Sequence, residues 1–191
     1  MTETEMANLA LAKLGIRPIA SLDAQEETAR TVKALYGPVL DFELSIYQWA
    51  FAVKRTAVAA LAEKPPFGFA YQYALPPDFL RLVEIDHPRM SRPDAYALEA
   101  DRILTDIPAP LKLRYISRVL TTIKYPPYFV QAFTCRLAYE LCERLKQDPA
   151  RKHTLLSEYT FIIRDAKRAN AIQLPVQALP LTDLEVAQYG D

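Results

Sequence analysis

The placement of prolines in the middle of this 191-residue chain is the feature that most restricts its fold. Eight prolines interrupt residues 50–122, at positions 65, 66, 76, 77, 88, 93, 108 and 110. A proline inside a helix removes a backbone hydrogen bond and collides with the preceding turn, so this segment cannot be one long helix. The short stretches between the prolines alternate apolar and polar residues, which predicts β-strands at 71–75, 80–85, 95–99, 102–105 and 111–118.

The last of these predicted strands shows the alternation most clearly. Successive side chains of a strand point to opposite faces of the sheet. Leu111, Leu113 and Tyr115 should therefore face one way, and Lys112 and Arg114 the other. One face of the predicted sheet is expected to be buried and the other solvated.

Both flanks of the proline-rich segment show helical patterns. Thr2 with Glu5 and Asp23 with Glu26 have the spacing of capping boxes, which predicts that helices begin at these two places. Gly37-Pro38 should kink or break the second helix, whose apolar pattern resumes beyond it. We therefore expect two collinear helices or one bent helix of roughly 23 residues.

Two further helices are predicted near the C-terminus. Pro126-Pro127 marks a helix start, and apolar residues then recur at helical spacing up to Asp148-Pro149. A last helix should cover about 151–171 and form an αα-hairpin with its predecessor. Cys135 and Cys142, the two cysteines, are separated by roughly 10 Å along the helix axis, too far for a disulfide. Both are expected to be buried thiols.

Residues 173–191 differ from the hairpin before them. They contain no Lys or Arg but three carboxylates, Asp183, Glu185 and Asp191. Seven large apolar residues are spread among them: Leu174, Val176, Leu179, Leu181, Leu184, Val186 and Tyr189. This composition is too apolar for a segment that stays solvated, so the segment is expected to dock on another surface.

These patterns together predict an α+β chain, mainly a helical bundle with an inserted small antiparallel β-sheet and an extended C-terminal tail. The expected parts are N-terminal helices, an inserted β-rich region, a C-terminal αα-hairpin and a docking tail, at residues 1–49, 50–124, 125–172 and 173–191. No stretch approaches the roughly 20 apolar residues of a membrane span, and the acidic N-terminus is unlike a signal peptide. A cytoplasmic protein without membrane contact is expected.

Several classes of enzyme are disfavoured by the composition. The four glycines, at positions 15, 37, 68 and 190, cannot form a P-loop or a dinucleotide-binding loop. His87 and His153 lie too far from each other and from the cysteines for a typical zinc motif. Asp86 with His87 would suit a hydrolase, but a turn at a strand end is the simpler interpretation. We expect no enzymatic activity, no bound metal and no cofactor.

Residues 71–81 contain the most specific motif of the sequence. Aromatic residues, a Leu-Pro step, an aspartate and a Leu-Arg pair follow one another here, at Tyr71, Tyr73, Pro76, Asp78, Leu80 and Arg81. Four other patches accompany it: residues 10–23, Trp49 and Phe51 with Arg55, residues 114–116, and residues 129–138. In these patches, which span residue 7 to about 170, the chain resembles the phage tail tubular protein A family. These proteins are the head-to-tail adaptors of short-tailed phages, with relatives in gene transfer agents.

The resemblance implies a structural subunit and no reaction. Such adaptors form a ring, commonly of twelve copies, at the neck of the particle. The portal lies above the ring, a tail, stopper or nozzle protein lies below it, and the genome passes through its lumen. A ring of this kind closes through head-to-tail contacts between copies. The chain has 23 basic and 23 acidic residues, and this balance suits transient, non-specific passage of DNA.

Two surfaces are expected to bind partners. The apolar residues of 173–191 should bind the portal, and the alternative is that they pack on the chain's own helices. Five basic residues of the last helix could face DNA or an acidic neighbour, although a solvated face is the simpler explanation: Arg151, Lys152, Arg164, Lys167 and Arg168. The alternative to a particle component is a soluble helical domain for protein interaction or regulation.

Overall fold

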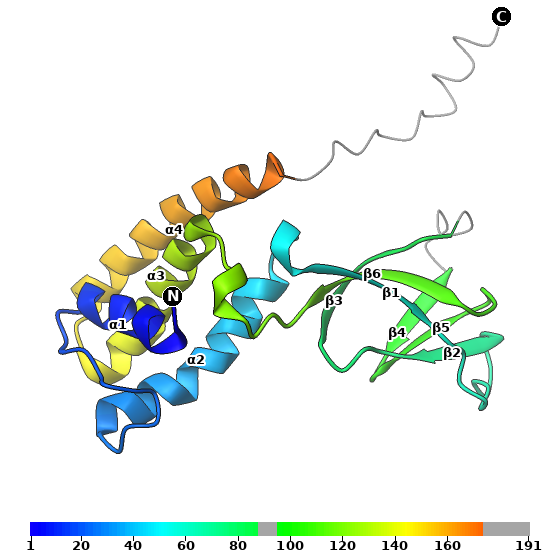
Figure 1. Ribbon diagram of the computed structural model, residues 1–191, viewed down its shortest axis with the longest axis horizontal. Coiled ribbons are helices and arrows are strands. Elements are labelled where there is room, and N and C mark those ends of the chain that lie inside the picture. Colours follow the sequence, from blue (N-terminus) through cyan, green and yellow to red (C-terminus); the bar gives the residue numbers. More distant parts are fainter. Residues whose placement is uncertain (88–94, 174–191) are drawn as a thin grey trace, which may run out of the picture.

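The computed structural model describes residues 1–87 and 95–173. Within these ranges the chain has two lobes, one helical and one made of β-strands (Figure 1). The helices are α1 (Glu3–Lys13), α2 (Glu27–Ser45), α3 (Pro127–Leu145) and α4 (Pro149–Ala171), with the short 3-10 helices η1 (Ala50–Ala52) and η3 (Thr122–Lys124). The strands are β1 (Val53–Val58), β2 (Tyr71–Ala74), β3 (Phe79–Ile85), β4 (Tyr96–Glu99), β5 (Arg102–Thr105) and β6 (Leu111–Ser117). The chain enters the β lobe after α2 and returns before α3.

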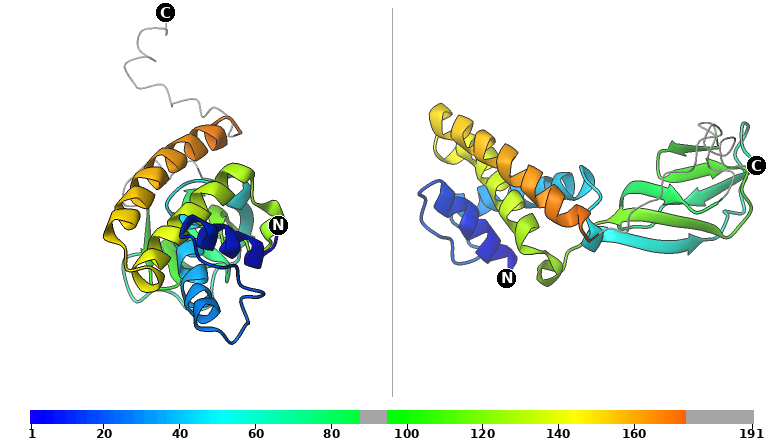
Figure 2. Two further views of the ribbon diagram at one scale, coloured as in Figure 1. Left: turned by 90° about the vertical axis from the view of Figure 1, so that its left-hand side faces the viewer. Right: turned by 90° about the horizontal axis from the view of Figure 1, so that it is seen from above.

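The helical lobe is organised around α3, which packs against α1, α2 and α4. Phe129, Phe133, Leu137 and Leu141 repeat every four residues along α3 and are completely buried. Figure 2 shows α4 lying along α3, so the predicted αα-hairpin is confirmed.

One of the two predicted capping boxes is present. Thr2 and Glu5 exchange hydrogen bonds between side chain and backbone at the start of α1. The second prediction is wrong, because Glu26 itself is the N-cap of α2 and makes no capping side-chain bond. Asp23 instead accepts a 2.6 Å hydrogen bond from Lys33 Nζ, which ties the preceding loop to the helix.

Helix α2 runs without interruption through Gly37-Pro38, so the predicted break is wrong. One bent helix of roughly 23 residues was the other expectation, and the structure has one helix of 19 residues. Gly37 lacks the Cβ that would collide with the proline ring, which lowers the cost of Pro38 in a helix. Tyr36, Val39 and Leu40 on either side of this step are buried in the core, so packing holds both halves in one helix.

The six strands form two three-stranded antiparallel sheets, in the orders β1-β6-β3 and β2-β5-β4. All five predicted strands are found, and β1 was not predicted. The expected alternation in β6 is confirmed, since Leu111, Leu113 and Tyr115 are buried while Lys112 is exposed and Arg114 half-buried.

The predicted fold class is wrong in its proportions. Helices make up 47% of the described residues, and the β region is not a small sheet inserted into a bundle. Side chains from both sheets share a separate apolar core, which contains Tyr73, Ile85, Ile103, Ile107, Leu111, Leu113 and Tyr115. A region that buries its own core forms a second lobe rather than an appendage of the first. The predicted tail, residues 173–191, lies outside the described residues except for Gln173.

Candidate interaction surfaces

Trp49 and Phe51, from the second patch on which the family resemblance rests, lie at the junction of the two lobes. They pack with Phe129 in an aromatic cluster, with ring centroids 5.2 Å (Trp49) and 4.9 Å (Phe51) from that of Phe129. Trp49 is completely buried, and its Nε1 donates a 2.7 Å hydrogen bond to the carbonyl oxygen of Glu43 at the end of α2. These motif residues therefore fix the exit from the helical lobe and form no open site.

Asp78, from the most specific motif, ties three strands together. Its carboxylate accepts hydrogen bonds from Lys54 Nζ in β1 (2.7 Å) and from the Tyr115 hydroxyl in β6 (2.8 Å). Partial burial opposes ionisation, but these two hydrogen bonds lower the pKa of Asp78 below its usual value. Its backbone oxygen also accepts a 2.7 Å bond from the Arg118 amide. The aspartate thus stabilises the β1-β6-β3 sheet.

The other members of that motif are also structural. Tyr73 is completely buried and donates a 2.6 Å hydrogen bond to the Ile107 carbonyl. Tyr71, with Tyr73, belongs to the core of the β lobe, whereas Leu80 packs against the helical core.

Arg81, from the same motif, is half-buried, and its Nε has no hydrogen-bond partner among the described residues. Pro76 precedes β3, and its carbonyl accepts a 3.0 Å bond from the Phe79 amide. This motif builds the fold.

Asn170, near the end of α4, has a role that the sequence did not reveal. Its side chain is completely buried, accepts a 2.8 Å bond from the Ala50 amide and donates a 2.8 Å bond to the Gln48 carbonyl. These bonds clamp the turn between α2 and η1 onto α4. An asparagine in the last turn of a helix usually indicates a helix end, so no local signal distinguishes this clamp.

The five basic residues singled out in the last helix do not form one surface. Arg151 lies in the first turn of α4, where its guanidinium donates to the Lys13 carbonyl (2.8 Å) and to Glu158 (3.2 Å). Lys152, beside it, binds Glu143 at 2.5 Å. Three basic residues lie near the other end of the helix, roughly 20 to 25 Å from Arg151 along its axis: Arg164, Lys167 and Arg168.

Two of the distal three basic residues are exposed. Arg164 and Arg168 share Asp165 at 3.8 and 3.7 Å, and these three side chains are exposed, whereas Lys167 is half-buried. Lys167 lies 5.3 Å from the ring centre of Tyr47. Together with Tyr47 and Ala171 these residues line a shallow basic pocket on the helical lobe.

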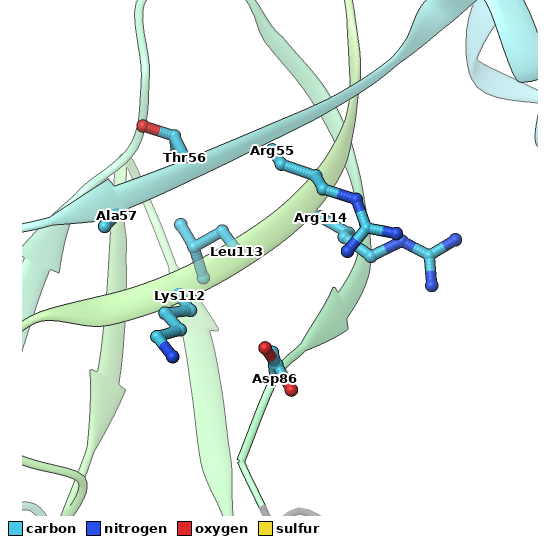
Figure 3. A pocket seen from close by; sticks show the side chains of 7 residues that line it. All are labelled: Arg55, Thr56, Ala57, Asp86, Lys112, Leu113 and Arg114. Carbon is cyan, nitrogen blue, oxygen red and sulfur yellow. The ribbon is translucent and has the colours of Figure 1, made fainter.

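A second basic surface lies on the solvated face of the β1-β6-β3 sheet. Figure 3 shows Arg55 and Arg114 side by side on neighbouring strands, with Lys112 and Asp86 close to them. The pocket that they line has a volume of about 320 Å³. The sequence predicted Lys112 and Arg114 on this face, but it did not place Arg55 there because β1 was not predicted.

An apolar groove crosses the helical lobe between α1, η3, α3 and α4. Two adjoining pockets, of about 400 and 630 Å³, make up the groove and share Leu9 and Gln131. Leu9 is 44% exposed and Ile123 81% exposed. Val130 and Ile162 contribute further apolar surface. Large exposed apolar patches on soluble domains typically mark sites of protein interaction.

The cysteines, the histidines and Asp86 were the other groups that the sequence offered for chemistry. In residues 1–87 and 95–173, no three His, Cys, Asp or Glu side chains are placed to hold a metal ion. Cys135 and Cys142 are free and buried, as predicted, and burial raises the pKa of the Cys135 thiol. Asp86 lines the basic pocket of the sheet, next to His87 in the chain. No helix in the described part of the chain has the length and hydropathy needed to cross a membrane.

The seven apolar tail residues, from Leu174 to Tyr189, lie outside the described residues, so their predicted portal contact remains a prediction. Gln173, just before them, places its Oε1 3.3 Å from the Tyr128 hydroxyl at the start of α3. The chain therefore leaves α4 beside the first turn of α3. Comparisons with protein-family models and with curated proteins found no match.

Proposed function

We propose that the chain is a structural connector subunit, which assembles with copies of itself into a ring between the portal and the tail of a phage or gene transfer agent. The observation that carries this proposal is the apolar groove of the helical lobe, where the exposed side chains of Leu9 and Ile123 line the same depression, because apolar residues that gather on one surface mark a site of protein interaction. Burying such a surface against a neighbouring copy favours assembly.

A ring requires each subunit to contact the next through two different surfaces. The groove is one such surface and lies on one side of the helical lobe, between α1 and η3. The β lobe projects from the other end of the molecule (Figure 1). A subunit of this elongated shape can pack its helical lobe against a neighbour while its β lobe stays free for a component above or below the ring.

The family motif supports a connector in particular. Its most specific patch, around Asp78, and the patch around Trp49 are far apart in sequence, but both lie at the passage between the lobes. Trp49 packs at the end of α2, and Asp78 binds Lys54 in the strand that follows. The motif residues therefore hold the passage from the helical lobe into the β1-β6-β3 sheet, where a connector subunit would join its two lobes. DNA passage through such a ring requires no catalysis.

Substituting a groove residue with aspartate should prevent the ring from forming. We expect Leu9→Asp and Ile123→Asp to leave the fold intact, because both side chains are solvated, and to place a charge inside the interface. Size-exclusion chromatography with light scattering, on the chain mixed with a candidate portal protein from the same genome, should show a ring of about twelve subunits for the native chain and free monomer for both variants.

Leu98→Asp is the matched control, since Leu98 is 48% exposed and lies on β4, away from the groove. It should assemble as the native chain does. The proposal is wrong if the native chain stays monomeric with portal, or if it forms a stable small complex with another protein and ignores portal. The second result would favour a soluble interaction or regulatory domain.

Removal of residues 174–191 should abolish attachment to portal while the rest of the chain stays folded. The truncation keeps Gln173, whose contact with Tyr128 closes the end of α4. Extended, the removed segment could reach up to roughly 60 Å, and its seven large apolar residues need a partner's surface to leave water. Co-sedimentation with portal measures attachment, and circular dichroism measures the fold. A truncated chain that is unfolded would instead show that the segment packs on its own helices.

A further inference from the structure

The solvated face of the β1-β6-β3 sheet contains an arrangement of charges that is unfavourable in an isolated subunit. Arg55 of β1 lies directly opposite Arg114 of β6 in the antiparallel register. Lys112, two residues from Arg114, points to the same face. Like charges directly opposite each other on neighbouring strands destabilise a sheet. An anion bound between them would remove this repulsion.

The acidic groups nearby neutralise part of this charge. Glu84 Oε2 lies 2.5 Å from Arg114 Nη1, and Asp86 lines the same pocket. Arg55 and Lys112 form no ion pair or hydrogen bond through their side chains within residues 1–87 and 95–173. Among the described residues of this face, three cations against two carboxylates leave one unit of positive charge.

The Arg114 side chain shows the same excess of donors. It is 15% exposed, and its Nε is buried without a hydrogen-bond acceptor among the described residues. A guanidinium presents donors in a planar fork that matches the oxygens of a phosphate or carboxylate. Because Arg114 Nε has no contact with solvent, an oxyanion at this face would be bound by the exposed Arg55 side chain and by the exposed part of Arg114.

The lining of the pocket decides which oxyanion fits. It consists of charged and small residues with Leu113, and none of its residues is aromatic. Stacking of unpaired bases needs aromatic side chains, so single-stranded nucleic acid is disfavoured. The apolar segment 173–191 would find little apolar surface here. Cations on an open sheet face can contact the phosphates of a duplex without reading its bases.

We propose that Arg55, Lys112 and Arg114 bind the phosphate backbone of double-stranded DNA. The binding is independent of sequence, because the contacts are to phosphates. Each subunit engages two or three phosphates, so one copy binds weakly and the affinity falls steeply with salt. That this face of the β lobe lies toward the passing genome rests on the proposed function. DNA binding by the single subunit is independent of that function.

The test measures fluorescence anisotropy of a short labelled duplex with the full-length chain, over a series of salt concentrations. The variant combines Arg55→Ala with Lys112→Ala. Its matched control combines Arg144→Ala with Lys146→Ala, which removes the same charge from exposed positions at the end of α3. We expect the sheet variant to bind about tenfold or more weakly and its salt slope to fall by about two, while the control binds as the native chain does.

Three results would overturn the proposal: no binding by the native chain at low salt, equal losses in the two double variants, or binding of a synthetic 173–191 peptide at this face in place of DNA. Ring formation with the portal protein is measured on the same samples of the native chain and of both double variants. If the sheet variant loses DNA binding but still forms rings, the two proposals are distinguished. Anisotropy then tests the DNA site, and ring formation tests the proposed function. Rings that form when the native chain binds no DNA would refute the DNA site alone.

Discussion

Replacing Phe129 by alanine is expected to lower the free energy of unfolding by about 3–5 kcal/mol. Phe129 is completely buried, and its ring contacts Trp49, Phe51 and Tyr125 at the junction of the lobes. The substitution removes the hydrophobic transfer energy of the ring and leaves a cavity that neighbouring aromatic side chains, held in their own contacts, cannot fill.

Trp49 is the single tryptophan of the chain, so its fluorescence reports unfolding at this junction during urea titration. Phe161→Ala is the matched control, because Phe161 is 61% exposed on α4 and its removal should change stability by about 0.5 kcal/mol or less. If both substitutions had equal effects, the aromatic cluster would not be the core of the junction.

Phe129 could be recognised from the sequence, because helical spacing of apolar residues marks a buried stripe whatever the partner helix is. The strands that alternate clearly were recognised for the same reason. β1 was not, because its central residues, Lys54 to Ala57, include two adjacent charges and it lies at the edge of its sheet. Edge strands that are half-exposed show little alternation between apolar and polar residues, so the sequence pattern does not reveal them.

The division into two sheets could not be predicted either. β1 pairs with β6, about sixty residues later in the chain, and β2 skips β3 and β4 to pair with β5. Local patterns give strands but not these long-range pairings. The basic face depends on one of them, because Arg55 becomes a neighbour of Arg114 only through the β1–β6 register. The sequence pattern therefore predicted Lys112 and Arg114 on this face. Arg55 was missed because its strand, β1, was not predicted.

Glu43 was missed for another reason, since a glutamate in a helix is normally solvated. Here it is completely buried on α2, where Oε1 accepts a 2.8 Å hydrogen bond from the Tyr159 hydroxyl and Oε2 has no partner in the described part of the chain. Burial raises the pKa of Glu43 to about 7, against the opposing effects of the Tyr159 hydrogen bond and of the charges on Arg136 and Lys167.

Glu43→Gln is therefore expected to make the folded chain more stable than the native chain at alkaline pH. The usual pKa of 4.5 applies in the unfolded chain, so between pH 4.5 and about 7 the folded chain holds a proton that the unfolded chain has lost. Native stability therefore falls as the pH rises through this window, by about 3 kcal/mol in total. Glutamine keeps an acceptor for Tyr159 and does not titrate, so its advantage should grow across the window and level off above it.

The pH dependence of the difference in unfolding free energy between Glu43→Gln and the native chain isolates this one carboxyl, because every other titrating group is common to both. Tyr159→Phe is a second test, because it removes the hydrogen bond that favours the ionised carboxylate of Glu43. The pKa of Glu43 should then rise further, and the loss of stability with rising pH should extend to higher pH. A constant difference between Glu43→Gln and the native chain from pH 5 to 8 would mean that Glu43 is ionised in the folded chain throughout this range. Arg136, whose guanidinium lies 5.5 Å from the Tyr159 ring, would then have to compensate its charge.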